Sequence, residues 1–390
     1  MRILMVHNTL NDSRSVSGVL RHYGWMANEW IAAGHQTDFV AAKCGFPQLR
    51  ELAPHSRLLS SDNFFDATRY FSQTWRYFAP YACRMASAHW LRLPERYDIV
   101  YASTQLIVEV YAALILARRE RAKLVGKVHH VLATQVKRVG LFDRLFLWSE
   151  RKTTRWLNTQ ADLIICGTQL VADDFHALER SLGLRESTTT QIGYGIDLAA
   201  IPYDEDRPKQ FDGVLLGRLH EHKGIFELPA IWKEVVTRRP GAKLFVIGEG
   251  PHRPRMEAMF AECGLRDAVT FTGGISEARK NELLAQARIG LSLSFEEGWG
   301  LSINEFLGAG LPVVAYDLPI FAQVFPGQLD LVQAGDREGA AAKILAFLKD
   351  EPRRREQGRR GRNFVARYDY RKVARAELQA LIAMFQTGYE

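Results

Sequence analysis

A glycine-bearing turn between two apolar runs carries the residues best suited to bind a phosphate. The segment FEEGWGLSINEFLGAG, residues 295–310, follows the apolar run IGLSLS and precedes PVVAYD. We expect a strand, a turn that opens a helix, and a second strand. Unpaired N–H groups at the start of such a helix attract anions, because the helix dipole also favours negative charge there. Gly300, Leu301 and Ser302 would supply these amides.

Two carboxylates flank this turn. Glu297 lies at its mouth, and Glu305 lies one turn into the expected helix. Carboxylates in these places can accept hydrogen bonds from sugar or ribose hydroxyl groups. Ser302-x-x-Glu305 is also a capping-box pattern, in which Glu305 would only reach back to the amide of the helix cap. Both interpretations stay open from this segment alone.

A second turn, GRLHEHKG at residues 217–224, follows the apolar run GVLLG. Arg218 and Lys223 would flank the step from strand to helix, where two cations could neutralise a leaving diphosphate. Most arginines and lysines are merely solvated surface residues. Because these two lie beside glycines where a strand ends, we favour the functional interpretation.

Short apolar runs alternate with helical patterns along the chain, which is typical of parallel sheets covered by helices. Ligands of such sheets bind outside the carboxyl ends of the strands, and two facing sheets would enclose one cleft. The strands expected in the first half are residues 2–7, 36–41, 98–102, 124–129 and 163–167, and those in the second half are 213–217, 243–248, 269–273, 289–294 and 313–317.

These patterns predict two α/β domains. The segment 191–210 contains GYGID and the Pro- and charge-rich IPYDEDRPKQ, a composition typical of a linker. We expect an N-terminal domain over 1–190, the linker over 191–210, a C-terminal domain over 211–365, and a helix over 366–390 that packs back on the first domain.

Composition limits the class of protein. A chain of 390 residues with 47% hydrophobic and 24% charged residues is typical of globular protein. No apolar segment approaches the roughly 20 residues that a membrane-spanning helix needs, so we do not expect an integral membrane protein. The four cysteines lie far apart without zinc-site spacing, which predicts reduced thiols in a cytoplasmic protein and no metal site. The net charge of +7 favours an anionic partner, but no nucleic-acid recognition motif is present.

The motifs of the second half, taken together, resemble a known family. GRLHEHKG, VIGEGP at 246–251, FTGG at 271–274 and the pair Glu297 and Glu305 are similar to the C-terminal domain of the retaining GT-B glycosyltransferases of family 4. The first half is similar more loosely, through SVSGVLRH, LVGKVHH, ADLIICGTQ and GYGID. The resemblance implies the GT-B fold, in which two Rossmann-like, doubly wound parallel-sheet domains face each other across a cleft.

The resemblance also implies roles for the matching residues. Arg218 and Lys223 would hold the donor diphosphate, and Glu305 would bind the ribose. Glu297 would contact the transferred sugar and His129 would lie close to it, although a register error would exchange His129 with His130. The expected catalytic residues are His129, Glu297, Arg218 and Lys223, and the expected donor-binding residues are Gly18, Arg218, Lys223, Gly248, Gly274, Glu297, Gly298, Trp299, Gly300, Leu301, Ser302 and Glu305.

The expected activity is retaining, metal-independent transfer of a sugar from a UDP- or GDP-sugar to a glycan, lipid-linked or polysaccharide acceptor, with no cofactor. A sugar phosphorylase, a nucleotide-sugar epimerase of the same fold and a non-catalytic nucleotide-sugar-binding protein stay open as alternatives. The first strand lacks a G-x-G-x-x-G turn, which argues against an oxidoreductase. The triplet 204–206 has the D-x-D form of a metal site, but it lies in the Pro-rich linker, where we expect a solvated acidic turn.

Aromatic and basic residues mix over 64–96 and in VKRVGLFDRLFLW at 136–148. Helices of this composition can dock on an anionic bilayer or stack against an acceptor. A core-facing aromatic stripe with a solvated basic face is the alternative for the first segment. The hypothesis from these segments is peripheral association with the inner face of the membrane.

Overall fold

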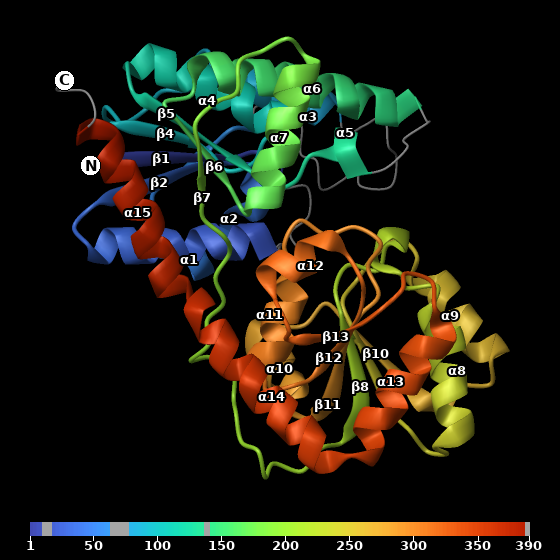
Figure 1. Ribbon diagram of the computed structural model, residues 1–390. Helices are drawn as coiled ribbons and strands as arrows, with labels where there is room; N and C mark the ends of the chain where they lie inside the picture. The colour runs from blue at the N-terminus through green and yellow to red at the C-terminus, as the bar shows by residue number, and fades with distance from the viewer. Residues whose placement is uncertain (10–17, 63–77, 136–140, 387–390) are drawn as a thin grey trace. The chain divides into compact units, whose positions relative to one another are not determined.

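The computed structural model describes residues 1–9, 18–62, 78–135 and 141–386 (Figure 1). The chain divides into two compact units. The first unit comprises Met1–Gly195 and Tyr370–Glu390, and the second unit comprises Ile196–Asp369. Each unit is built around one parallel sheet with helices packed against it.

The sheet of the first unit has, within the described residues, the strand order β3-β2-β1-β4-β5-β6-β7, and every pairing is parallel. The central strands are buried along almost their whole length, as parallel strands covered on both faces must be. The strands are β1 (Arg2–His7), β2 (Gln36–Ala41), β3 (Leu58–Ser60), β4 (Ile99–Ala102), β5 (Lys123–Val128), β6 (Leu163–Cys166) and β7 (Thr189–Gln191).

The helices of the first unit connect these strands. The helix α4 follows β4 and carries a continuous buried stripe that packs against the sheet. The helices are α1 (Gly18–Ala32), α2 (Phe46–Leu52), α3 (Phe78–Ser87), α4 (Ile107–Glu120), α5 (Leu132–Gln135), α6 (Leu141–Gln160), α7 (Gln169–Ser181) and the C-terminal α15 (Tyr370–Gln386), with a short 3-10 helix at Lys43–Gly45.

The second unit repeats this arrangement with the described strand order β10-β9-β8-β11-β12-β13, again all parallel. Trp232 and Phe260 fill the core on one side of the sheet. The strands are β8 (Phe211–Leu216), β9 (Leu244–Ile247), β10 (Val269–Gly273), β11 (Ala287–Ser292), β12 (Val313–Tyr316) and β13 (Leu329–Val332). The helices are α8 (Leu228–Arg238), α9 (Arg253–Glu262), α10 (Glu277–Ala285), α11 (Leu301–Gly308), α12 (Pro319–Val324), α13 (Arg337–Lys349) and α14 (Glu351–Val365), with 3-10 helices at Glu221–Lys223, Arg266–Ala268 and Ala366–Tyr368.

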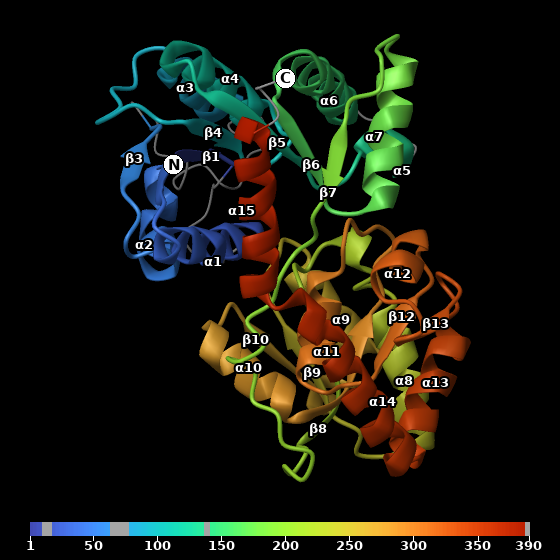
Figure 2. The ribbon, with the colours of Figure 1, turned by 60° about the vertical axis from the view of Figure 1, so that its left-hand side comes forward.

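The helix α15 returns the chain to the first unit, where it lies along α1 (Figures 1 and 2). The indole Nε1 of Trp30 donates to the carbonyl of Ala374 at 2.9 Å. Leu381 is buried in the same core as Trp30. The last described helix therefore completes the hydrophobic core that the first residues begin.

All ten expected strands are present, and the two-sheet Rossmann-like architecture predicted from the sequence is confirmed. The structure adds β3, β7 and β13, each at the edge of its sheet. No helix among the described residues is both long enough and apolar enough to span a bilayer.

Candidate functional site

The predicted phosphate-binding cations follow β8, and the predicted sugar-binding carboxylate follows β11. These strands are neighbours, and the strand order of the second unit reverses between them. The Nζ atom of Lys223 lies 2.6 Å from Oε1 of Glu297. The Oγ atom of Ser294 donates to the same carboxylate oxygen at 2.8 Å. The structure thus brings Lys223 and Glu297 into direct contact, although 74 residues separate them in the sequence.

The two turns are held together by their backbones. The amide of Phe295 donates to the carbonyl of His222 at 2.8 Å. Gly224 has a φ of 63°, and a Cβ atom there would lie 1.9 Å from the carbonyl oxygen of Leu293. Any other residue at position 224 would push the turns apart, so this glycine sets the distance between Lys223 and Glu297.

The Arg218 side chain is exposed at the same edge of the sheet. Within the described ranges, no carboxylate forms an ion pair with it. Its neighbours His220 and His222 contact each other through their Nδ1 atoms at 2.7 Å. Burial and the charge of Lys223 lower the pKa of His222 to about 4, and burial and the charge of Arg218 lower the pKa of His220. At neutral pH the positive charge of this turn therefore resides on Arg218 and Lys223.

The helix α11 begins directly after Gly300, which has a φ of 100° and acts as the cap residue. Leu301 and Ser302 are the first two helical residues, so their amides belong to the turn whose N–H groups have no partner within the helix. Gly298 is half-buried in the preceding loop. Trp299 is buried, with its ring edge-on to Tyr368 at 5.1 Å between centroids.

The contacts of Glu305 differ from the capping-box alternative. Because the cap is Gly300, Ser302 is the second helical residue and cannot cap this helix. Instead, Oε1 of Glu305 accepts from Nζ of Lys280 on α10 at 2.6 Å, and both side chains are buried. The Lys280 ammonium also contacts Glu277 at 2.6 Å. The capping-box interpretation is therefore wrong, and Glu305 is a buried carboxylate held by a lysine that no sequence motif indicated.

Two more of the predicted donor residues, Gly248 and Gly274, follow the next two strands in the sheet of the second unit. Gly248 comes after β9 and donates its amide to the carbonyl of Gly273 at 3.2 Å. A Cβ atom on Gly248 would lie 2.0 Å from the carbonyl oxygen of Gly217. Gly274 is exposed directly after β10. The carboxyl ends of β10, β9, β8 and β11 therefore carry the predicted donor residues side by side.

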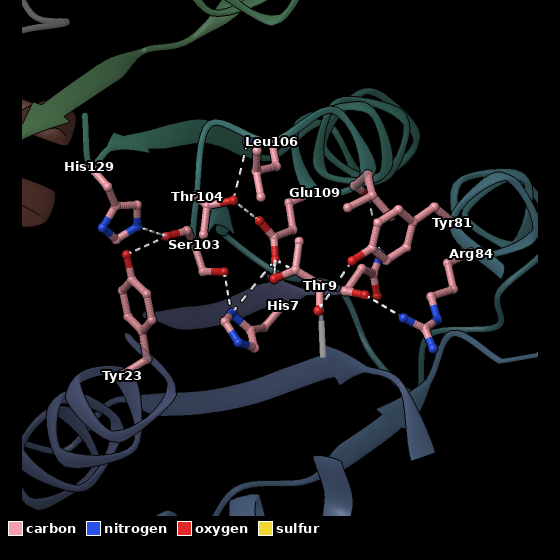
Figure 3. Close-up of polar contacts among 12 residues, drawn as sticks. His7, Thr9, Tyr23, Tyr81, Arg84, Ser103, Thr104, Leu106, Glu109 and His129 are labelled. Atoms are coloured by element: carbon pink, nitrogen blue, oxygen red, sulfur yellow. Dashed lines mark hydrogen bonds and ion pairs between the residues drawn. The ribbon is translucent and has the colours of Figure 1, made fainter. Parts of the chain in front are cut away.

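A second polar cluster lies where the strand order of the first unit reverses, between β1 and β4 (Figure 3). The carboxylate of Glu109, on α4, accepts from the amide of Thr9 at 3.2 Å and from its hydroxyl at 2.7 Å. The Nδ1 atom of His7 lies 2.7 Å from Oγ of Ser103 and 3.7 Å from Glu109. Burial raises the pKa of Glu109 to about 7 and lowers the pKa of His7 to about 4.

His129 follows β5, beside this cluster (Figure 3). Its Nε2 atom lies 2.7 Å from the carbonyl oxygen of Ser103, so Nε2 carries the proton and donates. Its Nδ1 atom then accepts from the hydroxyl of Tyr194. Burial lowers the pKa of His129 to about 3. This imidazole is neutral at physiological pH, and both ring nitrogens are hydrogen-bonded to the protein.

Two other predicted residues belong to the first unit. Gly18 is the first residue of α1 and is half-buried. Ser17, which precedes it in the matching segment SVSGVLRH, lies outside the described residues. His130, the alternative to His129, is half-buried, and its carbonyl accepts from the side chain of Gln105.

Two family models match almost the whole chain. The model for glycosyltransferase family 4 matches residues 16–200, and the model for glycosyl transferases group 1 matches residues 205–364. The chain belongs to glycosyltransferase family 4. The transferase is 26% identical to a glycogen synthase of Mycobacterium tuberculosis, over 98% of this chain and 95% of that protein.

Other known proteins are similar in part or in fold. A GDP-mannose:cellobiosyl-diphosphopolyprenol alpha-mannosyltransferase of Xanthomonas campestris is 31% identical over 40% of this chain and 43% of its own. The crystal structure of HepE from Anabaena with UDP and glucose has a TM-score of 0.74 and 17% identity, covering 98% of this chain and 100% of that one. The GT-B fold of the transferase is thus shared with a protein that binds UDP.

The D-x-D triplet of the linker makes contacts of another kind. Asp206 pairs with Arg355 at 2.9 Å, and Glu205 accepts from the hydroxyl of Tyr203 at 2.5 Å. Asp206 is 88% exposed. Among the described residues, no three metal-ligating side chains are grouped together. Two residues of this triplet thus contact an arginine and a tyrosine of the same chain.

Proposed function

We propose that this transferase moves a sugar from a UDP- or GDP-sugar to a glycan, lipid-linked or polysaccharide acceptor, with retention of the anomeric configuration and without a metal ion. The observation that carries the proposal is the convergence of Arg218, Lys223 and Glu297 where the strand order of the second unit reverses. Ligands of open α/β sheets bind at that position. The UDP and glucose bound by HepE and the GDP-mannose in the name of the Xanthomonas relative support a nucleotide-sugar donor.

The chemistry requires stabilisation of a leaving diphosphate. As the glycosidic bond breaks, negative charge grows on the phosphate oxygens, and preorganised positive groups lower the barrier most. Arg218 can grip two oxygens at once, Lys223 supplies a point charge, and the first amides of α11 add the helix dipole. These groups supply the positive charge for which other transferases use a metal ion.

The ion pair between Lys223 and Glu297 fits an exchange on donor binding. The diphosphate would take Lys223 as a partner, and the Glu297 carboxylate would then accept a hydrogen bond from a hydroxyl of the sugar. Ser294 keeps a hydrogen bond to Glu297 throughout, so the carboxylate stays oriented when its cation turns away. Before the donor binds, the pair keeps both charges hydrogen-bonded.

The neutral imidazole of His129 suits a hydrogen-bonding role better than proton transfer, since its pKa is about 3. In the proposed retaining reaction, the acceptor hydroxyl attacks the anomeric carbon from the face that the diphosphate leaves. Its proton passes to the departing phosphate oxygen. No side chain has to act as general base in this sequence.

The test is the melting temperature of the purified transferase with UDP-, GDP- and ADP-sugars in the presence of EDTA, because a ligand of the folded state raises it. We expect one base to stabilise the protein, and Arg218→Gln to abolish the effect. Transfer assays with the selected donor should proceed in EDTA and give a product with the donor's anomeric configuration by NMR. Absence of any response to nucleotide-sugars, dependence on Mg²⁺ or an inverted product would each contradict the corresponding part of the proposal.

We further propose that α6 docks on an anionic membrane surface on the cytoplasmic side. Phe146 is 45% and Trp148 is 54% exposed, and the exposed cations Arg144 and Arg151 lie beside them. Exposed aromatic and basic residues on one helix are typical of interfacial binding.

The test is co-sedimentation with anionic vesicles at low salt. The wild-type protein should sediment with the vesicles, and Trp148→Ser should stay in the supernatant. Phe385→Ser, at a residue of α15 that is 37% exposed and lies outside both aromatic and basic segments, is the control. Failure of the wild type to sediment would refute membrane docking.

A further inference from the structure

A cavity of about 230 Å³ lies in the second unit, at the N-terminal ends of the strands. The donor residues lie at the opposite, carboxyl ends. In Figure 1, the yellow-green segment that leads into β8 runs below this sheet, on the side where α14 begins. The two ends of the six-residue β8 are roughly 20 Å apart. The cavity is lined by the linker 203–209, by Arg288 at the start of β11, by the turn 309–311 before β12, and by Glu351, Arg354 and Arg355 of α14.

The cavity is lined by residues of both charges, and two of its arginines are less exposed than two of its carboxylates. The side chain of Arg354 is 10% exposed and that of Arg288 is 27% exposed. The carboxylates of Asp206 and Glu351 are 88% and 55% exposed. Water screens exposed charges far more than buried ones. The attraction of an entering anion to Arg354 is therefore screened less than its repulsion by Asp206 and Glu351, whereas Arg288 already pairs with the buried Asp212 at 3.3 Å.

Lys209 also lines this cavity. Its Nζ atom donates to the carbonyl of Ala285 at 2.8 Å. Burial and the positive charges of Arg354, Arg207 and Arg288 lower the pKa of Lys209 to about 8, against a weaker opposing effect of Asp204. The cations of the cavity therefore repel each other in the unliganded protein.

The protein neutralises these cations only in part. Arg354 donates to the carbonyl of Phe347 at 3.2 Å, and its nearest carboxylate, Glu351, is 3.6 Å away and shared with Arg355. Within the described ranges, the guanidinium of Arg207 forms no ion pair. Arginine forks match the oxygens of a tetrahedral anion, and a bound phosphate would relieve the repulsion.

We propose that this cavity binds a phosphate group, either as the free ion or at the end of a sugar phosphate, and that the bound anion stabilises the second unit. The volume equals that of roughly eight waters, which is enough for a phosphate group. It is smaller than the roughly 300–1,000 Å³ of sites for drug-sized ligands, which argues against a whole nucleotide-sugar. The inference does not depend on the proposed donor or acceptor.

The first experiment is calorimetric titration of the full chain with inorganic phosphate, glucose 6-phosphate and glucose at constant ionic strength. We expect both phosphates to bind and glucose not to bind. At least ten-fold tighter binding of the sugar phosphate would identify it as the ligand class, and equal affinities would identify the free ion. Binding of glucose as tight as that of its phosphate would overturn the proposal.

Variants separate this cavity from the donor site, which could also bind phosphate. Lys209→Gln and Arg207→Gln should each weaken phosphate binding at least ten-fold, while Arg218→Gln should retain it. Arg353→Gln is the matched control, because Arg353 lies on α14 beside the cavity residues but pairs with Asp330 at 3.2 Å. Unchanged affinity in both cavity variants, or loss in Arg218→Gln alone, would overturn the proposal.

A proton measurement tests Lys209 directly. Sulfate does not titrate near neutral pH, so any proton taken up from the buffer when it binds is taken up by the protein. At pH 8, an anion beside Lys209 should raise its pKa and draw a fraction of a proton from the buffer. Titrations in two buffers of different ionisation enthalpy should show this uptake in the wild type and not in Lys209→Gln. Equal uptake in both proteins would contradict the assignment of Lys209 to the site.

Discussion

The contact between Lys223 and Glu297 predicts different effects on nucleotide binding and on transfer. In Glu297→Gln, Lys223 loses its anionic partner and is available to phosphate at once, so the affinity for free UDP or GDP should stay the same or rise. The sugar loses a charged hydrogen-bond acceptor, and the transfer rate should fall on the order of 100-fold. Nucleotide titration and initial rates measure the two effects separately.

The matched control for this variant is Glu221→Gln, an exposed carboxylate in the same turn. It should leave both quantities unchanged within about two-fold, since exposed charges are largely screened by solvent. A parallel loss of nucleotide affinity and rate in Glu297→Gln would show that the carboxylate supports the fold of the turn instead of contacting the sugar.

His129 predicts a pH dependence of stability. Its pKa is about 3 in the folded protein, and an unfolded histidine titrates near 6.5, so the unfolded chain binds more protons between these values. The free energy of unfolding therefore falls as the pH is lowered from 6.5, by at most about 1.4 kcal/mol per pH unit from this residue. Urea unfolding at pH 5 and 7.5 should show a smaller loss in His129→Gln than in the wild type.

The control is His55→Gln, which replaces an exposed histidine. It should keep the wild-type pH dependence, because the variant leaves the buried His129 and its two hydrogen bonds in place. If His129→Gln retains the full wild-type loss of stability on acidification, the imidazole is protonated in the folded protein. The neutral hydrogen-bonded form inferred from Tyr194 and Ser103 would then be wrong.

The sequence predicted site residues that lie in a short recognisable motif. It did not predict residues that are distant in the sequence and that only the strand order brings together. Arg218 and Glu297 were predicted because each lies in a glycine-bearing turn directly after an apolar run. His7 and Glu109 were not predicted, because they are 102 positions apart and meet only where β1 pairs with β4. The carboxyl ends of strands at a reversal of order could have indicated this cluster, had the strand order been known.

At the scale of elements, the central strands were predictable and three edge strands were not. A strand covered on both faces must be apolar throughout, and β1, β4 and β12 have this pattern. The edge strands β3 and β7 are only half-buried and three residues long, so their sequences resemble loops. The spacing of apolar residues indicates a strand only where its side chains are buried, and β3 and β7 are too exposed to have such a pattern.

The attachment of α15 predicts a large effect from one carboxylate. Oε2 of Glu377 lies 2.6 Å from Nζ of Lys127 on β5, both side chains are fully buried, and the hydroxyl of Tyr101 donates to the same carboxylate. Glu377→Leu would leave the Lys127 charge unpaired and should lower the free energy of unfolding by about 3 to 5 kcal/mol. Chemical denaturation followed by tryptophan fluorescence measures this.

Gln379→Ala is the control on the same helix, because its side chain is exposed, and it should change stability by less than about 0.5 kcal/mol. The double variant Lys127→Met with Glu377→Leu should recover most of the loss, since it removes both buried charges. A double variant as unstable as Glu377→Leu alone would show that packing around α15, and not the unpaired lysine, causes the effect.

At the scale of the molecule, the second unit is one continuous segment inserted into the first. Its two ends lie side by side, because the amide of Ile196 donates to the carbonyl of Tyr368 at 2.9 Å. We predict that the isolated segment 196–369 folds cooperatively and binds the same nucleotide as the full chain. Thermal melts with and without the nucleotide test both statements.

The complementary truncation removes α15 by ending the chain at position 369. The shortened chain should lose cooperative unfolding of the first unit, because Trp30 and Lys127 lose their partners, while nucleotide binding by the second unit persists. An unfolded 196–369 segment would contradict the independence of the second unit. A truncated chain with two intact transitions would contradict the requirement for α15.

This insertion also sets an order of events on the ribosome. The helix α15 begins 338 residues after the end of α1 (370 − 32). At roughly 5 to 20 residues per second, α15 therefore emerges roughly 17 to 68 s after α1. During that interval the surface of α1 that α15 covers has no partner, whereas the second unit can fold as soon as it has emerged. Nascent chains should therefore recruit chaperones at α1. Translation that stops before α15 would yield a protein in which the second unit is folded and the first unit is not.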